Sequence, residues 1–187
     1  MSSNPRPCLA ANRSALRWAA LAAIIMVAGC GRREVPPPRP VPVDRPPISL
    51  PRALPVTSYV ATAASIDLYD IRAGELALER GNARNRDYAT RLIADHRGTS
   101  AQLSFAGRRL NLLPSAQMAA PHQAMADALA VSGDFDATFR RQQIDIHSSS
   151  QRMHAAFAAR GDSPTLRPVA SNAAAVEARH LDEARGL

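Results

Sequence analysis

Imidazole and carboxylate side chains interrupt two apolar stripes of this sequence, at positions where apolar side chains are expected. His96 falls in line with apolar residues at helical spacing, and His180 does the same further along the chain. Glu177 stands three residues before His180, so the two form a Glu-x-x-His pattern. Metal centres inside helical bundles use carboxylates and imidazoles in this pattern, and the donors suit Fe, Mn, Zn or Cu. One hypothesis is therefore a transition-metal site in an apolar core.

The axial positions of the candidate ligands indicate that they can meet. A helix rises about 1.5 Å per residue, so Asp70 and His96 lie about 18 and 21 Å from a turn placed near residue 82. His147 and Glu177 each lie 15 residues from a second turn near residue 162, and His180 lies 18 residues from it. The hypothesis therefore assigns Asp70, His96, His147, Glu177 and His180 to one level near mid-height.

Three further carboxylates are alternate ligands. Asp95 directly precedes His96, and adjacent residues point about 100° apart on a helix. Glu75 lies only about 10 Å from the first turn. Asp145 flanks Ile146 in a later apolar stripe.

Two interpretations without a metal remain open. The same side chains could form a buried hydrogen-bonded network that fixes the register of the helices, or their common level could be incidental. A complete carboxylate-bridged pair of metal ions uses four carboxylates and two Glu-x-x-His patterns. The sequence holds one such pattern.

No catalytic residue is assigned. Three serines at 148–150 follow His147, but neighbours on one helix cannot form a set of nucleophile, base and orienting group. His122 follows a proline at a predicted helix start, and we expect it to be solvated. His154 falls on another face than its apolar neighbour, and we expect it at the surface. These residues leave enzymatic activity open and do not favour it.

Apolar residues at three- and four-residue spacing predict helices from residue 58 onward. The first helix is expected to place Leu78 on its inward stripe and to end at Gly81 in a left-handed cap. No run alternates with period two. The predicted fold class is therefore all-α, a ferritin-like four-helix bundle with a short crossover helix between the second and third long helices. The long helices are predicted over residues 58–80, 83–110, 134–160 and, after a cap at Ser163, to 185, with the short helix over 121–131.

The N-terminus has the pattern of an export signal. Arginines precede an 11-residue apolar run, which is shorter than the roughly 20 residues of a membrane span. The run ends in Val27-Ala28-Gly29-Cys30, which resembles the bacterial lipobox, where the cysteine is acylated. We expect residues 1–29 to be a lipoprotein signal peptide and Cys30 to carry lipid, with Gly31 favouring an outer-membrane protein that faces the periplasm. The alternative is a short buried helix that ends in a buried cysteine.

Residues 30–58 are expected to form a tether. Nine prolines in residues 31–58 favour polyproline-II structure and a spacer role, although such a segment can also be a docking peptide. The folded domain is then 59–187. It contains 15 Arg and 14 Asp or Glu, so the formal charge of +7 lies mostly outside it and no nucleic-acid partner is expected. The cysteines are Cys8 and Cys30, so the domain has no thiol ligand.

Several segments resemble the bacterial domain-of-unknown-function 4142 family, often described as putative outer membrane proteins. The matching segments are Ile66-Asp67-Leu68-Tyr69-Asp70-Ile71, Glu75-Leu76-Ala77-Leu78, Ile93-Ala94-Asp95-His96, His122-Gln123-Ala124-Met125, Phe135-Asp136-Ala137, Gln142-Gln143 with His147, and His180-Leu181. Asp70 stands where the family usually has Glu, and residues 147–150 replace its usual His-Gln-Glu-Ala. The resemblance implies a ferritin-like bundle and an envelope location, and it brings no established activity.

Two classes of function follow. In the first, a lipid-anchored bundle acts through its surface as a structural or interaction module with an envelope protein partner. In the second, the bundle binds a metal ion for storage, sensing or redox protection. The first predicts an exposed apolar patch and interior polar groups bonded to one another, and the second predicts ligand atoms that converge. Neither sets an oligomeric state.

Overall fold

The computed structural model describes residues 51–187, and these residues form five α-helices and no strand. The predicted all-α bundle with a short crossover helix is confirmed. The signal peptide, Cys30 and most of the tether lie outside the described residues. Within residues 51–187 no helix combines the length and apolar character that a membrane span requires. The helices are α1 (Val56–Arg80), α2 (Ala83–Arg108), α3 (Ala120–Ala130), α4 (Phe135–Arg160) and α5 (Arg167–Arg185).

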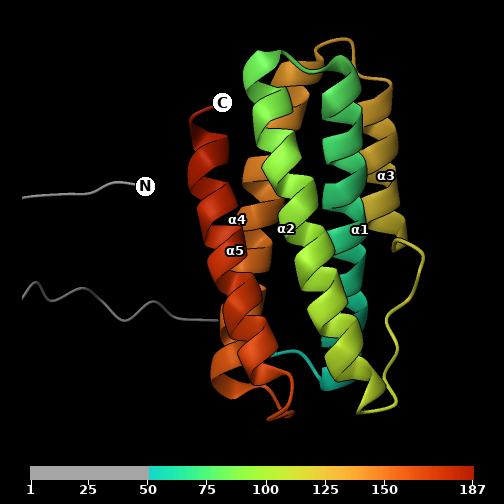
Figure 1. The fold of residues 1–187 in the computed structure, drawn as a ribbon, viewed down its shortest axis with the longest axis vertical. Helices are drawn as coiled ribbons and strands as arrows, with labels where there is room; N and C mark the ends of the chain where they lie inside the picture. Colours follow the sequence, from blue (N-terminus) through green and yellow to red (C-terminus); the bar gives the residue numbers. More distant parts are fainter. Residues whose placement is uncertain (1–50) are drawn as a thin grey trace, which may run out of the picture. The chain divides into compact units, whose positions relative to one another are not determined.

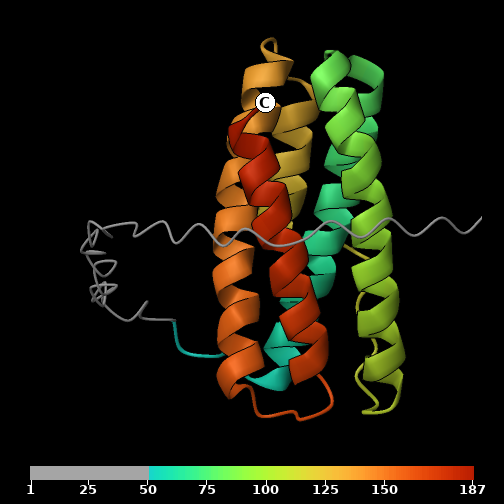
Figure 2. The same ribbon diagram turned by 60° about the vertical axis from the view of Figure 1, so that its left-hand side comes forward.

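The helical unit consists of two helical hairpins packed side by side. Helices α1 and α2 form one hairpin and α4 and α5 the other, with further contacts between α2 and α5 and between α1 and α4 (Figures 1 and 2). Helices α2 and α4 run in the same direction, so the chain between them must return along the length of the bundle (Figure 1). The short helix α3 lies on this return path and packs on α1 and α4.

Side-chain caps begin two of the long helices. Asn82 accepts a hydrogen bond of 3.0 Å from the backbone N–H of Asn85, and Asp134 accepts one of 3.2 Å from Ala137. Both satisfy N–H groups that a helix start leaves unpaired. The predicted cap at Ser163 is wrong. Residues 164–166 form a turn instead, and α5 begins at Arg167.

The end of α1 differs from the prediction. Gly81 has φ −73° and ψ 158°, which is extended rather than left-handed. A glycine is nevertheless required there, because a Cβ would lie 2.6 Å from the carbonyl oxygen of Ala77. The close approach lets the Gly81 N–H donate to that oxygen at 2.9 Å and lets the chain turn directly into α2.

Apolar side chains form two core clusters, one toward each end of the bundle. The first centres on Tyr69, Leu92 and Phe139, and the second centres on Tyr59, Leu103 and Phe157. Leu78, predicted to face inward, is 42% exposed, because the neighbouring stripe of α1 faces the core. That stripe contributes Ala63, Ile66, Ala73 and Leu76, all buried.

The crossover is tied to α1 by a buried hydroxyl. Ser65 Oγ accepts the backbone N–H of Ala119 at 2.7 Å and shares a hydrogen bond of 2.6 Å with His122 Nδ1. His122, expected to be solvated, is therefore half-buried at the start of α3. Further along, Gln142 accepts from Tyr69 Oη at 2.8 Å and donates to the carbonyl of Met125 at 3.0 Å. These bonds hold the return segment against the bundle.

Replacing Ser65 with alanine is expected to destabilise the protein by about 1–3 kcal/mol, because the N–H of Ala119 loses its acceptor. Urea denaturation followed by circular dichroism measures the free energy of unfolding. The control is Ser104→Ala on α2, a partly buried hydroxyl with no hydrogen bond recorded among the described residues. Equal stability of the two variants would show that the Ser65 contact does not hold the crossover.

Candidate metal centre

Four ionisable side chains meet at mid-height of the bundle, one from each long helix. They are Asp70 from α1, His96 from α2, His147 from α4 and Glu177 from α5. One ligand atom of each lies within 4.8 Å of the others. The side chains of Asp70, His96 and His147 are fully buried, and Glu177 is 2% exposed. Four of the five residues assigned to one level therefore lie together, between the two apolar clusters.

The ring of His96 is oriented by a buried carboxylate. Its Nδ1 lies 2.9 Å from Oδ1 of Asp67, and the hydroxyl of Thr99 donates to the same oxygen at 2.7 Å. This leaves Nε2 of His96 facing Oδ2 of Asp70 at 3.5 Å, and neither atom has a hydrogen-bond partner. A histidine that binds a metal commonly donates its other ring N–H to a carboxylate. Asp67 holds the ring in that way.

The other half of the cluster is more fully bonded. Nδ1 of His147 lies 2.6 Å from Oε2 of Glu177, which also accepts from Ser150 Oγ at 2.6 Å. Nε2 of His147 lies 2.9 Å from Tyr88 Oη and 3.0 Å from Gln143 Oε1. These contacts orient both the imidazole and the carboxylate before any ligand is present.

Gln143 connects the two halves. Its amide nitrogen donates to Oδ1 of Asp70 at 3.3 Å, while its carbonyl oxygen contacts His147. Four polar residues form a line on α4 at spacings of four, three and four: Gln143, His147, Ser150 and His154. That repeat is the signal in the sequence that places all four polar residues on one buried face.

His154 is buried, contrary to the prediction of a surface position. It is 4% exposed, shares a hydrogen bond of 2.9 Å with Tyr59 Oη and places Nε2 3.6 Å from Oε1 of Glu177. It lies seven residues after His147, which is two helical turns, so both rings face the interior. Burial lowers the pKa of His154, which keeps the ring neutral.

His180, the fifth residue assigned to this level, lies beside the four rather than among them. Its ring is fully buried, with its centroid 5.5 Å from that of His96 and 5.4 Å from that of His147. Its Nε2 lies 3.0 Å from Oδ2 of Asp95, yet the contact lacks the alignment of a hydrogen bond. Asp95, whose side chain is 34% exposed, therefore stands between His180 and solvent.

The other two alternate ligands lie outside the cluster. Glu75 is 41% exposed and lies 3.6 Å from Arg72 and 3.9 Å from Arg97. Asp145 is exposed on α4. Neither side chain faces the core, so neither can share its centre.

Buried negative charge dominates the centre. The ion-pair partners of Asp67, Asp70 and Glu177 within residues 51–187 are all histidines. Burial is the main effect on Asp70, and it raises the pKa of that carboxyl to about 6. Burial by itself would raise the pKa of Glu177 too, but its hydrogen bond to His147 and the nearby imidazoles lower it to about 2.

The imidazoles respond to this charge in opposite ways. Burial lowers the pKa of His96, but Asp70 and the hydrogen bond to Asp67 outweigh it and raise the pKa to about 10. At neutral pH a proton on Nε2 of His96 therefore faces Asp70. Burial, reinforced by the charges of His96 and His147, lowers the pKa of His180 to about 3. The neutral ring of His180 keeps a free lone pair.

The donor set fits a divalent transition-metal ion. Carboxylate oxygen and imidazole nitrogen suit Cu(II), Zn, Fe or Mn, whereas Cu(I) favours sulfur ligands. A tetrahedral ion about 2.1 Å from each donor needs donor atoms about 3.4 Å apart. The ligand atoms of the four side chains lie within 4.8 Å of one another, which is near this spacing, and His147 would have to give up a hydrogen bond to bind an ion. Asp70 Oδ2 and His96 Nε2 are the donor atoms that no hydrogen bond occupies.

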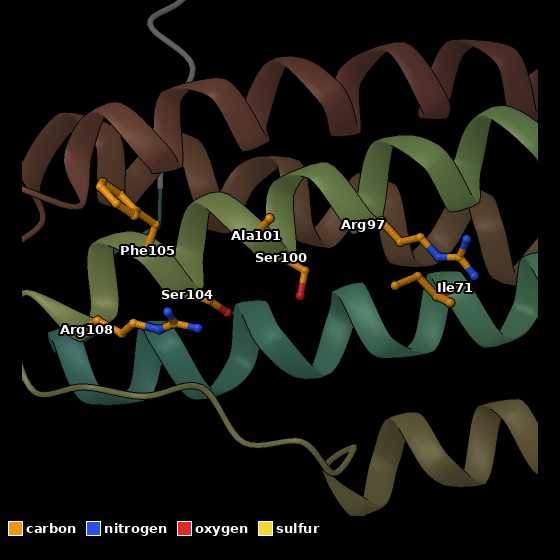
Figure 3. Close-up of a pocket in the computed structure, with 7 residues that line it drawn as sticks. All are labelled: Ile71, Arg97, Ser100, Ala101, Ser104, Phe105 and Arg108. Carbon is orange, nitrogen blue, oxygen red and sulfur yellow. The ribbon is translucent and has the colours of Figure 1, made fainter.

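A large surface hollow lies elsewhere, over the α1–α2 face (Figure 3). Its volume is about 470 Å³, and none of the four clustered residues lines it. It is bordered by Ile71, Arg97, Ser100, Ala101, Ser104, Phe105 and Arg108. The chemistry of the cluster is therefore internal to the bundle.

Comparisons with known proteins agree with the fold. The sequence profile of the family described as "Domain of unknown function (DUF4142)" matches residues 52–187. The solved structure "CopM in the Cu(I)-bound form" is similar with a TM-score of 0.60 and 15% identity, covering 71% of this chain and 94% of CopM. "CopM in the Cu(II)-bound form" gives 0.61 and 18%, covering 72% and 95%. At these identities the likeness establishes the fold only. No curated protein sequence matches significantly.

The metal-free protein is expected to lose about 1–3 kcal/mol of unfolding free energy between pH 7 and 9. A group whose pKa is raised by folding, here His96 from 6.5 to about 10, stabilises the fold below its unfolded pKa. That stabilisation disappears as the pH rises toward the folded value. Urea denaturation of chelator-treated protein at each pH measures the effect.

His96→Gln is expected to flatten this alkaline slope. The matched control is His122→Gln, which changes a half-buried imidazole outside the centre. If the unfolding free energy of His96→Gln falls with pH as steeply as that of the wild-type protein, another group titrates.

Proposed function

Because the chain belongs to the DUF4142 family, whose description names no function, we propose a function from the core itself: binding of a divalent transition-metal ion by Asp70, His96, His147 and Glu177. One observation carries the proposal. Oδ2 of Asp70 and Nε2 of His96, both buried, lie 3.5 Å apart without a hydrogen-bond partner. A buried polar atom without a partner costs about 1–3 kcal/mol, and a cation between these two would remove that cost.

The residues around the ligands prepare the site for a cation. Asp67 fixes the ring of His96, and Ser150 holds the carboxylate of Glu177. Binding requires His96 to give up the Nε2 proton that faces Asp70, because a ligand imidazole must be neutral there. A bound ion would supply the positive charge that this proton provides beside Asp70.

Copper in its divalent state is the first candidate ion. The two similar solved structures are the Cu(I)-bound and Cu(II)-bound forms of CopM. The nitrogen and oxygen donors of this chain favour Cu(II) over Cu(I), and they also suit Zn, Fe and Mn. A bound ion, held away from water, would serve in storage, sensing or redox protection.

The bundle works outside the cytoplasm in this proposal. The lipobox-like residues 27–30 support acylation of Cys30, and the following proline-rich segment supports a tether between an outer-membrane lipid anchor and the bundle. A tethered bundle in the periplasm would meet metal ions that cross the outer membrane.

A second candidate function, an interaction module with an envelope protein partner, has one observation in its favour. Phe105 is 69% exposed and borders the hollow of about 470 Å³ (Figure 3) and a second one of about 290 Å³. Aromatic residues are enriched at the centres of protein interfaces. The unpartnered atoms of the core argue for the metal as the main function.

The metal-free protein is expected to bind one equivalent of Cu(II) and to release about one proton at pH 7, because His96 must deprotonate. Calorimetric titration in buffers of different ionisation enthalpy measures stoichiometry, affinity and proton release together. Glu177→Gln is expected to lower the affinity at least tenfold.

The control for that variant is Glu183→Gln, the same change on the same helix at a partly exposed residue paired with Arg91. Titrations with Zn, Fe(II) and Mn accompany the Cu(II) experiment. Wild-type protein that binds none of the four ions would refute the metal function, as would equal affinities of the two glutamine variants.

Cys30→Ser is expected to remove the lipid and release the protein from the membrane fraction, because the thiol is the predicted acylation site. Mass spectrometry of the N-terminal peptide and membrane fractionation measure the change. Cys8→Ser, which lies within the predicted signal peptide, is expected to remain anchored. Membrane retention of Cys30→Ser, together with an unmodified Cys30 in the wild-type protein, would contradict the anchor.

A further inference from the structure

His180 has an unusual position for a buried imidazole. It is fully buried on α5, and neither ring nitrogen has a hydrogen-bond partner. A neutral imidazole has one donor and one acceptor to satisfy, and buried groups that satisfy neither are rare. Of the three histidines that the sequence assigned to mid-height, His180 is the one that the four-residue cluster does not include.

The carboxylate beside His180 stands where a second ligand would. Oδ2 of Asp95 lies 3.0 Å from Nε2 of His180 without hydrogen-bond alignment. Two neighbouring ligands of one metal ion, each about 2.1 Å from it at a right angle, are about 3.0 Å apart. Their lone pairs point at the ion rather than at each other. The separation of this pair is therefore compatible with two ligands of one cation.

The pair connects the protein surface with the core. Asp95 is 34% exposed, whereas the ring of His180 is fully buried and stacks near His96 and His147, with centroids 5.5 and 5.4 Å away. An ion held by Asp95 and His180 would thus be about one ring spacing from His96 and His147. Both the outer and the inner position combine an aspartate with a histidine of a facing helix.

The guanidinium of Arg179 is hydrogen-bonded to the carboxylate of Asp95. Nη2 of Arg179 donates to Oδ2 of Asp95 at 2.9 Å, and the Arg179 side chain is 50% exposed. Exposed ion pairs of this kind are weak, so a divalent cation can displace the arginine. Arg179 therefore competes with the ion for the outer position.

We propose that Asp95 and His180 form an outer site for a divalent transition-metal ion, through which the ion passes between solvent and the core. The inference rests on the proposed metal function and adds the route by which the ion reaches the core. In this route Arg179 leaves Asp95, the ion binds Asp95 and His180, and it then transfers to Asp70 and His96.

The test measures the rate of Cu(II) uptake. Metal-free protein is mixed with Cu(II) in a stopped-flow instrument, and quenching of tyrosine fluorescence reports arrival, since Tyr88 lies 5.5 Å from His180. Asp95→Asn and His180→Gln are expected to slow uptake about tenfold, while calorimetry still finds one equivalent bound. Arg179→Gln is expected to accelerate uptake, because it removes the competitor and keeps both ligands.

The control is Asp87→Asn, which removes an exposed charge from the same helix as Asp95. If Asp95→Asn takes up Cu(II) at the rate of Asp87→Asn, the outer site is overturned. The same holds if Asp95→Asn and Arg179→Gln change the rate of Cu(II) uptake in the same direction. If wild-type protein binds Cu(II) and Glu177→Gln does not, the core function stands even when the outer site fails. If wild-type protein binds no metal, both fail.

Discussion

The structure depends on charge that is buried at mid-height of four helices. Asp67, Asp70 and Glu177 are removed from water, and their ion-pair partners within residues 51–187 are imidazoles. A buried carboxylate is costly unless it is paired and hydrogen-bonded. The helices must therefore keep a register that places each histidine opposite its carboxylate. The apolar clusters on either side supply the packing that holds this register.

The pairing in this layer is asymmetric, and the asymmetry gives the centre its chemistry. His147 and Glu177 are bonded to Ser150, Tyr88 and Gln143, so they are oriented in advance. The facing atoms of Asp70 and His96 lie 3.5 Å apart as an ion pair, and neither makes a hydrogen bond. A rigid half beside an unsatisfied half resembles a prepared binding site more than a closed polar network, in which each group would be satisfied.

The constant rise of a helix explains why part of the site could be predicted from the sequence. Counting residues from two turns placed Asp70, His96, His147 and Glu177 at one level, and the structure brings them together. Which way each residue faces was less predictable. Leu78 points outward and His154 inward, because alanine-rich helices carry small apolar residues around much of their circumference. The supporting role of Asp67 also depends on contact with another helix, 29 residues away.

The sequence by itself determined the all-α class, the crossover and the axial level of the four clustered residues, since apolar spacing, turn residues and helical rise are local properties of the chain. Tertiary structure alone decided the rotation of each helix and the start of α5. It also decided that His180 lies against partly exposed Asp95 instead of joining the four clustered residues. These features depend on which side chains of neighbouring helices fill the same space, and that packing is a property of the assembled bundle rather than of any one segment.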